Sequence, residues 1–140
     1  MAVLDANILI ALTMPDPGHA IVRAQWERWA RIDEQLHAPD VLPFEVANVL
    51  ARRIALGEMQ LTEVEPTWAA IKALEIEIHT FDLIRDGPRV VAIAASLQRR
   101  HATDCVYVNL AERLGETLWT LDGPFARVAQ QAGYPVRLLT

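Results

Sequence analysis

The chain has 140 residues, of which 52% are hydrophobic and 22% are charged. This composition is typical of a globular protein with its own core, and it excludes a disordered one. The longest apolar stretch, residues 90–97, is far shorter than the ~20 residues that cross a bilayer. Cys105 is the only cysteine. We therefore expect residues 1–140 to form a single cytoplasmic domain without membrane attachment or an internal disulfide.

The formal net charge of −5 argues against a protein that coats nucleic acid by charge alone. Local basic groups remain, and all of them except Lys72 are arginines. Arginine binds phosphate oxygens in two-pronged geometry. Arg52 and Arg99, each next to a second arginine, are therefore candidates for contact with a substrate phosphate. The alternative is that they are solvated cations near helix ends.

The first half of the chain alternates apolar runs with helical patterns. The patterns predict a strand at 2–4, a helical turn at 7–12, a helix at 18–33, a strand at 36–38 and a helix between 40 and 57. The segment from Pro15 to Gly18 interrupts the helical turn. We expect Asp40 to cap the last of these helices and Gly57 to close it.

The second half repeats this alternation. A helix is predicted from Thr62, with Glu65 three residues later in a capping-box pattern. There follow a strand at 76–81, a helix at 87–100, a helix at 103–114, a strand at 117–121, a helix at 123–132 and a strand at 136–139. We expect Thr103 to cap its helix and Gly115 to take the left-handed position after it.

Strands separated by helices indicate a parallel sheet with both faces covered. We therefore expect an α/β fold, a three-layer α/β/α sandwich around a central, mostly parallel sheet of about five strands. Right-handed crossovers bring the C-terminal ends of such strands to one edge. In open α/β sheets, ligands bind at that edge.

Four acidic residues fall near this predicted edge. Asp5 and Asp122 each follow a buried strand, Asp104 begins a helix, and Glu45 lies one turn into another helix beside its apolar stripe. Clustered carboxylates stay ionised most easily when a hard cation lies between them. Mg²⁺ or Mn²⁺ held there could activate water and stabilise the charge of a breaking phosphodiester. The pattern therefore favours a metal-assisted phosphodiesterase.

Structural interpretations compete with this one. A single Asp at a strand–helix junction is commonly a helix cap, which is our interpretation of Asp40, Asp82 and Asp86. The four histidines show no metal-ligand spacing, so zinc is less expected than magnesium. Cys105 is interpreted as a small buried hydrophobic residue.

Four segments of the sequence resemble a known family, the PIN domains. The segment from Val3 to Ile10 is similar to the strand that delivers the family's first metal-binding Asp. The segment from Pro43 to Leu50 resembles the one that carries its Glu. The segments from Ala102 to Ala111 and from Leu118 to Phe125 resemble its third and fourth acidic motifs. The four matches come in the right order and span nearly the whole chain.

The resemblance implies a PIN fold and a Mg²⁺- or Mn²⁺-dependent endoribonuclease, most similar to the VapC-like toxins of type II toxin–antitoxin systems. It implies an RNA substrate, a cognate antitoxin and a homodimer. Carried over by motif, the catalytic and metal-binding residues would be Asp5, Glu45, Asp104 and Asp122. Asn7 and Thr120 would either orient these ligands or serve only the structure.

Two departures from the family pattern stand out. Cys105 follows Asp104 where alanine is common, and Gly123-Pro124 follow Asp122 where polar residues are common. Two alternative functions stay open: an RNA-processing nuclease without an antitoxin, and a catalytically inactive PIN-like binding module. The tryptophans at 26, 29 and 68 would either pack in the core or form a partner surface.

Overall fold

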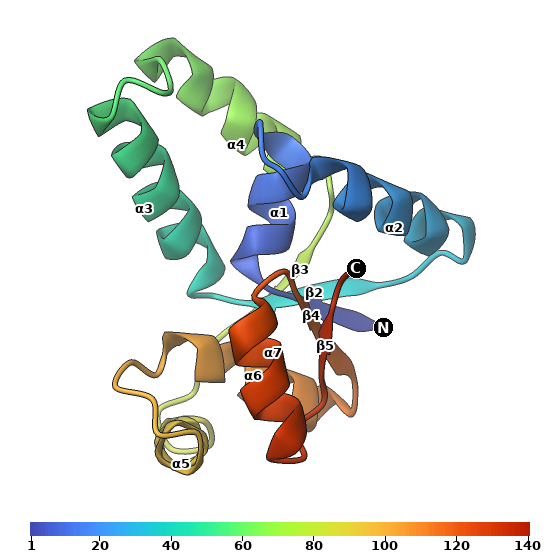
Figure 1. The fold of residues 1–140 in the computed structure, drawn as a ribbon, viewed down its shortest axis with the longest axis vertical. Helices are drawn as coiled ribbons and strands as arrows, with labels where there is room; N and C mark the ends of the chain where they lie inside the picture. Colours follow the sequence, from blue (N-terminus) through green and yellow to red (C-terminus); the bar gives the residue numbers. More distant parts are fainter.

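A computed structural model describes all 140 residues and contains one five-stranded sheet, in which every neighbouring pair is parallel (Figure 1). The strand order is β3-β2-β1-β4-β5. The strands are β1 (Ala2–Leu4), β2 (Leu36–Pro39), β3 (Glu77–His79), β4 (Thr117–Thr120) and β5 (Val136–Leu138). The predicted α/β class and parallel sheet are confirmed.

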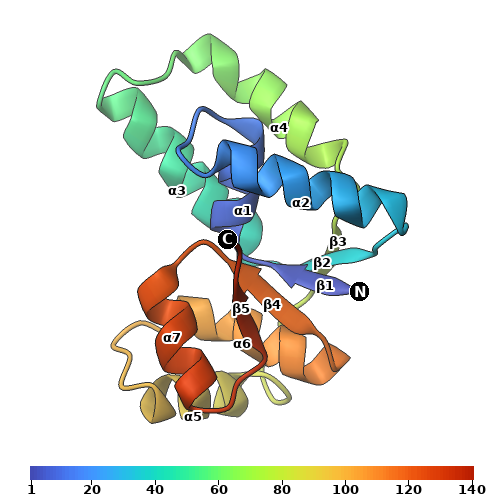
Figure 2. The same cartoon turned by 45° about the vertical axis from the view of Figure 1, so that its right-hand side comes forward.

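Seven α-helices flank this sheet. They are α1 (Ala6–Thr13), α2 (His19–Arg31), α3 (Leu42–Ala55), α4 (Val64–Lys72), α5 (Gly87–Ser96), α6 (Thr103–Leu114) and α7 (Gly123–Gln131), and the 3₁₀ turn η1 (Leu61–Glu63) precedes α4. Helices α1 to α4 lie on one side of the sheet and α5 to α7 on the other (Figures 1 and 2). No helix has both the length and the apolar character that crossing a membrane requires.

Strand β1 lies at the centre of the sheet, and its residues are all buried. A parallel strand that helices cover on both faces is apolar throughout, which explains the run Ala2-Val3-Leu4. Sequentially connected strands run outward from β1 through β2 to β3, and outward from β4 to β5 on the other side. The strand order therefore reverses between β1 and β4, where open α/β sheets form their ligand crevice.

The expected helix caps at Asp40 and Thr103 are wrong. Helix α3 begins two residues after Asp40, whose Oδ2 accepts a hydrogen bond from the Phe81 N–H at 3.0 Å. Asp40 therefore joins the segment after β2 to the segment after β3. Ala102 occupies the N-cap position of α6, and no side chain caps that helix. The hydrogen-bond partner of the Asp40 carboxylate is distant in sequence, so the spacing of nearby residues does not reveal it.

The predicted capping box at Thr62 and Glu65 is shifted by two residues. Gln60 and Glu63 form it instead, and the Glu63 carboxylate accepts a 2.7 Å hydrogen bond from the Gln60 N–H. The predicted helix 87–100 ends early, at Ser96, and Gln98 has a positive φ of 53°. Gly115 has a φ of 67° after α6, as predicted.

Candidate metal centre

Asp5 directly follows β1 and occupies the N-cap position of α1, at the point where the strand order reverses. Its extended backbone (φ −70°, ψ 151°) lets the chain turn from strand into helix. The side chain is 7% exposed. Its Oδ2 accepts hydrogen bonds from the Thr120 hydroxyl at 2.8 Å and from Asn7 Nδ2 at 3.2 Å. Asp5 is therefore both buried and fixed in orientation.

Hydrogen bonds of the Asn7 and Thr120 side chains link the ends of β1 and β4. Asn7 Nδ2 donates to the Thr120 hydroxyl oxygen at 3.0 Å, and Asn7 Oδ1 accepts from the Leu121 N–H at 3.1 Å. The Thr120 oxygen also accepts from the Asp122 N–H at 3.0 Å. The hydrogen bonds of both side chains thus position Asp5 and the turn after β4.

Glu45 lies in the first turn of α3 and Asp104 in the first turn of α6. Burial, aided by the charge of Asp104, raises the pKa of Asp5 to about 6. Burial and the charges of Asp5 and Asp104 raise the pKa of Glu45 to about 7. The structure therefore brings Asp104 close enough to Asp5 and Glu45 for its charge to oppose their ionisation.

Glu45 Oε1 is buried without a hydrogen bond of normal geometry, although the Tyr107 hydroxyl lies close enough to moderate the raised pKa of Glu45. An unpaired buried carboxylate oxygen is costly unless it finds a donor or a cation. Carboxylate oxygens are the hard ligands that Mg²⁺ and Mn²⁺ prefer, although the ligand atoms of Asp5, Glu45 and Asp104 do not all lie within 4.8 Å of one another in this structure. The residues present therefore fit the metal that the sequence pattern favours.

Tyr107 lies in α6, three residues after Asp104, and was missed as a neighbour of the acids. Its hydroxyl is buried without a hydrogen-bond partner that satisfies normal geometry. Burial and the charges of Glu45 and Asp5 raise its pKa far above the ordinary range, so it stays protonated. The helical i, i+3 spacing from Asp104 was the signal that could have placed it there. Tyr107 is fully buried and belongs to the core.

Asp104 is partly accessible, with a side chain 36% exposed. Its Oδ2 forms an ion pair with Arg99. The Arg99 guanidinium also lies 4.9 Å from the centre of the Phe125 ring, a cation–π contact. Arg99 is thus held at the mouth of the acidic cluster rather than in free solvent.

Asp122 occupies a different position from the other three acids. It is the N-cap of α7, and its Oδ1 accepts from the Phe125 N–H at 3.0 Å. It is not among the charges that chiefly shift the pKa of Asp5 or Glu45. Asp122 lines a cavity of about 380 Å³ together with Asn7 and Arg52. It therefore lies beside the cluster, connected to it through Asn7 and Thr120.

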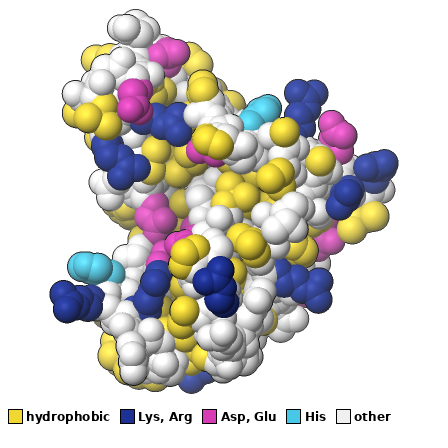
Figure 3. Space-filling view, in the orientation of Figure 1, with side chains coloured by type: hydrophobic (Ala, Val, Ile, Leu, Met, Phe, Trp, Pro, Cys, Tyr) yellow, Lys and Arg dark blue, Asp and Glu magenta, His cyan; other side chains and the backbone are white.

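Figure 3 shows acidic side chains gathered in a notch below the arm that α3 and α4 form in Figure 1. Basic side chains border this notch on the side of α5 to α7. A recessed acidic centre with cations around it suits a metal ion and a polyanionic substrate together.

Asp86 is a structural residue, though not in the way that its N-cap position suggested. Its side chain makes no cap hydrogen bond; it accepts from Arg85, from Asn109 Nδ2 at 3.0 Å and from the Asp82 N–H at 2.8 Å. The Arg85 guanidinium holds the pKa of Asp86 well below its usual range. Asp82 does not cap a helix either: its Oδ1 accepts from the N–H groups of Ile84 and Arg85, in the turn that precedes α5.

The histidines show no metal-ligand spacing in the sequence, but the structure brings two of them together. His37 and His79 lie together with Glu77 on β2 and β3. Their ligand atoms all lie within 4.8 Å of one another. Sequence spacing could not show this, because 42 residues separate the two histidines and only strand pairing brings them together.

Comparison with known proteins gives consistent matches. The PIN domain family matches residues 2–131. Ribonuclease VapC3 from Pyrobaculum aerophilum is 33% identical over 131 residues, which are 89% of this chain and 91% of that protein. The crystal structure of PAE2754 from Pyrobaculum aerophilum has a TM-score of 0.68 at 18% identity, over 99% of this chain and 88% of the other. A toxin–antitoxin complex from Klebsiella pneumoniae has a TM-score of 0.62 at 18% identity, over 87% of each chain. At these identities the two structures are similar in fold alone.

Proposed function

Because this chain belongs to the PIN domain family, we propose that it is a metal-dependent endoribonuclease and the toxin of a type II toxin–antitoxin pair, with residues 1–140 acting as one nuclease domain. The supporting relative is Ribonuclease VapC3, which resembles this chain over nearly its full length. The observation that carries the proposal is the cluster of Asp5, Glu45 and Asp104, where Glu45 Oε1 is buried without a hydrogen bond of normal geometry.

In this proposal Asp5, Glu45 and Asp104 hold Mg²⁺ or Mn²⁺, and Asp122 completes the acidic set from the neighbouring turn. The ion, when bound, supplies an activated water and stabilises negative charge at the scissile phosphate. The chain itself contributes the fixed geometry, since Thr120 and Asn7 hold Asp5 in one orientation. Supporting hydrogen bonds of this kind position metal ligands.

Arginines at the edge of the site are proposed to contact RNA phosphates. Arg52 lines the same cavity as Asp122 and has no ion-pair partner within 4.0 Å. Arg99 is paired with Asp104 and stacked on Phe125. The Arg99 guanidinium therefore lies at the edge of the acidic cluster, where its donors would contact a substrate phosphate.

The proposed partners are RNA, a cognate antitoxin and a second copy of the chain, all in the cytoplasm. The Klebsiella pneumoniae structure is a toxin–antitoxin complex and shares this fold. Large apolar side chains that are mostly exposed, Phe44 at 72%, Leu83 at 79% and Ile84 at 86%, support a partner surface on this chain.

The experiment measures RNA cleavage with Mg²⁺ or Mn²⁺ and growth on expression, for wild type and for Asp5→Asn and Asp104→Asn. We expect the wild-type protein to cleave RNA and EDTA to abolish this cleavage. Expression of the wild type should arrest growth unless an antitoxin from a neighbouring reading frame is co-expressed. Both variants should lose cleavage because carboxamides are poor ligands for hard cations.

Asp33→Asn is the matched control, because Asp33 is exposed and belongs to no hydrogen bond or ion pair of the site. It should keep wild-type cleavage, and circular dichroism should show all three variants folded. Cleavage without growth arrest would favour an RNA-processing nuclease. Absence of metal-dependent cleavage would contradict the proposal and favour an inactive binding module.

A further inference from the structure

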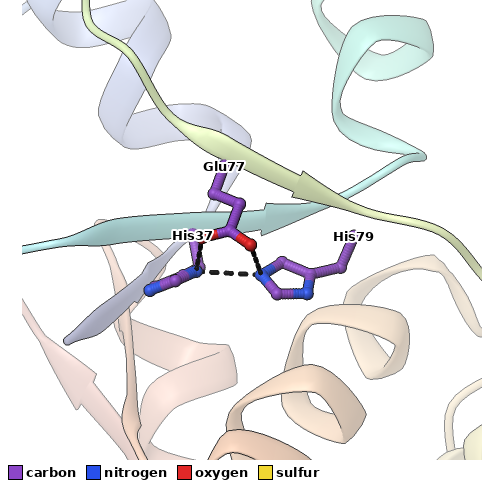
Figure 4. A group of neighbouring side chains, drawn as sticks. All are labelled: His37, Glu77 and His79. Carbon is purple, nitrogen blue, oxygen red and sulfur yellow. Dashed lines mark hydrogen bonds and ion pairs between the residues drawn. The ribbon is translucent and has the colours of Figure 1, made fainter.

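His37, Glu77 and His79 form a second cluster of ligating atoms, to which none of the four acids of the candidate metal centre belongs (Figure 4). His37 Nδ1 and His79 Nε2 are 2.8 Å apart. The Glu77 carboxylate lies over both, with Oε2 at 3.4 Å from His37 Nδ1 and Oε1 at 3.9 Å from His79 Nε2. Two imidazole nitrogens and a carboxylate oxygen thus converge on one point.

The sheet dictates this convergence. His37 and Glu77 are direct partners in the parallel pair of β2 and β3, so their side chains leave the same face. His79 lies two residues after Glu77, and side chains at that spacing also share a face. The three ligands are therefore set on paired strands rather than on a loop.

The close approach of His37 Nδ1 and His79 Nε2 limits which of these nitrogens can carry a proton. At 2.8 Å they share one proton, because two N–H groups cannot point at each other and two lone pairs would repel. Moving that proton to the second nitrogen of its own ring leaves two free lone pairs beside a carboxylate. Neutral imidazoles with a carboxylate are a ligand set of divalent transition metals such as Zn²⁺.

The surroundings give a cation access from one side. Glu77 is exposed and lines a cavity of about 510 Å³ that also carries Asp33, Glu34 and Glu75. The Glu34 carboxylate pairs with the amino terminus, whereas Asp33 and Glu75 have no ion pair. Several carboxylates lining one cavity raise the local concentration of cations there.

The basic groups on the other side are already neutralised. Arg85 and Arg113 lie near His79 and would repel a cation. Both face Asp86, with Arg85 Nη2 at 2.8 Å and Arg113 Nε at 3.7 Å from its carboxylate oxygens. Asp86 therefore offsets much of the charge that opposes a metal here.

We propose that His37, Glu77 and His79 bind one divalent transition-metal ion of the Zn²⁺ class, which fastens the edge strand β3 to β2. Strand β3 is short, lies at the edge of the sheet and has two exposed residues among its three. An ion held by both strands would stabilise this pairing independently of the nuclease site.

The test measures Zn²⁺ binding by calorimetry and thermal unfolding with and without Zn²⁺, on tag-free full-length protein in an Asp104→Asn background. This background weakens the acidic cluster as a competing site and leaves the histidines unchanged. We expect one ion per chain and a higher Tm with Zn²⁺. Glu77→Gln and His79→Gln should each weaken binding by at least about 10- to 100-fold, since loss of a mere supporting partner of a ligand already costs that much, and should remove the Tm increase.

Glu75→Gln is the matched control, an exposed carboxylate in the same cavity that lies outside the cluster. It should bind Zn²⁺ like its parent. The proposal is overturned if Zn²⁺ neither binds nor raises the Tm, or if both cluster variants bind it like the parent; the histidines would then form only a hydrogen-bonded pair. RNA cleavage is not the readout, so this outcome does not depend on the nuclease proposal.

Discussion

Thr120 and Asn7, which come from opposite ends of the chain, hold the buried Asp5 carboxylate through Oδ2. Neither of these bonds uses Oδ1, and the charge of Asp104 opposes the ionisation of Asp5. A carboxylate fixed by hydrogen bonds on one oxygen has the other available for a cation. The geometry of Asp5 therefore depends on residues that need not touch the ion.

Thr120→Val tests this dependence because valine has nearly the same shape and lacks the hydroxyl. We expect RNA cleavage to fall by about 10- to 100-fold, since supporting partners of metal ligands contribute on that scale. The comparison is with Thr117→Val on the same strand, where the hydroxyl makes no side-chain hydrogen bond to the site. Equal activity of the two variants would mean that Thr120 does not position Asp5.

At the scale of elements, each acid of the cluster lies at the start of a helix or the end of a strand. Asp5 follows β1, and Glu45 and Asp104 lie in the first turns of α3 and α6. The amino ends of α3 and α6 carry partial positive charge, which moderates the repulsion among the carboxylates. The placement of α6 relative to β4 also depends on the turn at Gly115, whose φ is 67°.

Gly115→Ala should therefore destabilise the protein by about 1 kcal/mol, because an alanine strains in the left-handed region. Chemical denaturation measures this loss. Gly87→Ala is the control: its φ is not positive and a Cβ there meets nothing within 4 Å. The two substitutions add the same methyl group, so equal effects would contradict the backbone explanation.

For the whole molecule, the acidic cluster carries a cost in stability that varies with pH. The pKa of Glu45 rises to about 7 and that of Asp5 to about 6, whereas unfolded carboxyl groups titrate near 4. A raised folded pKa contributes stability that is complete below the unfolded pKa and is lost as pH rises through the folded pKa. Without metal, these groups therefore favour the folded state most at acidic pH.

Thermal unfolding of wild type and Glu45→Gln between pH 5 and 8 should reveal this cost. We expect the Tm of wild type to fall relative to the variant as pH rises through about 7, because glutamine cannot ionise. Mg²⁺ should raise the Tm of wild type at pH 8 and have a smaller effect on the variant. A constant difference between the two proteins across this range would contradict the raised pKa of Glu45.

Local patterns in the sequence were sufficient for the order and type of the strands and helices and for the parallel sheet. Three signals determine the backbone conformation only of residues next to them: the apolar runs, Gly115, and the acids after Leu4 and Leu121. They can therefore be interpreted before the fold is known. The chain order of elements then requires strand ends at one edge, which explains why Asp5 was foreseen beside other acids.

Only the tertiary structure decided which side chains become partners across the chain. Asp40 bonds the Phe81 N–H instead of capping α3, Tyr107 lies against Glu45, and His37 meets His79. The physical reason is the same in each case. A polar group takes the partner that strand pairing and helix packing bring to it, and the spacing of nearby residues does not show which distant segments will lie side by side.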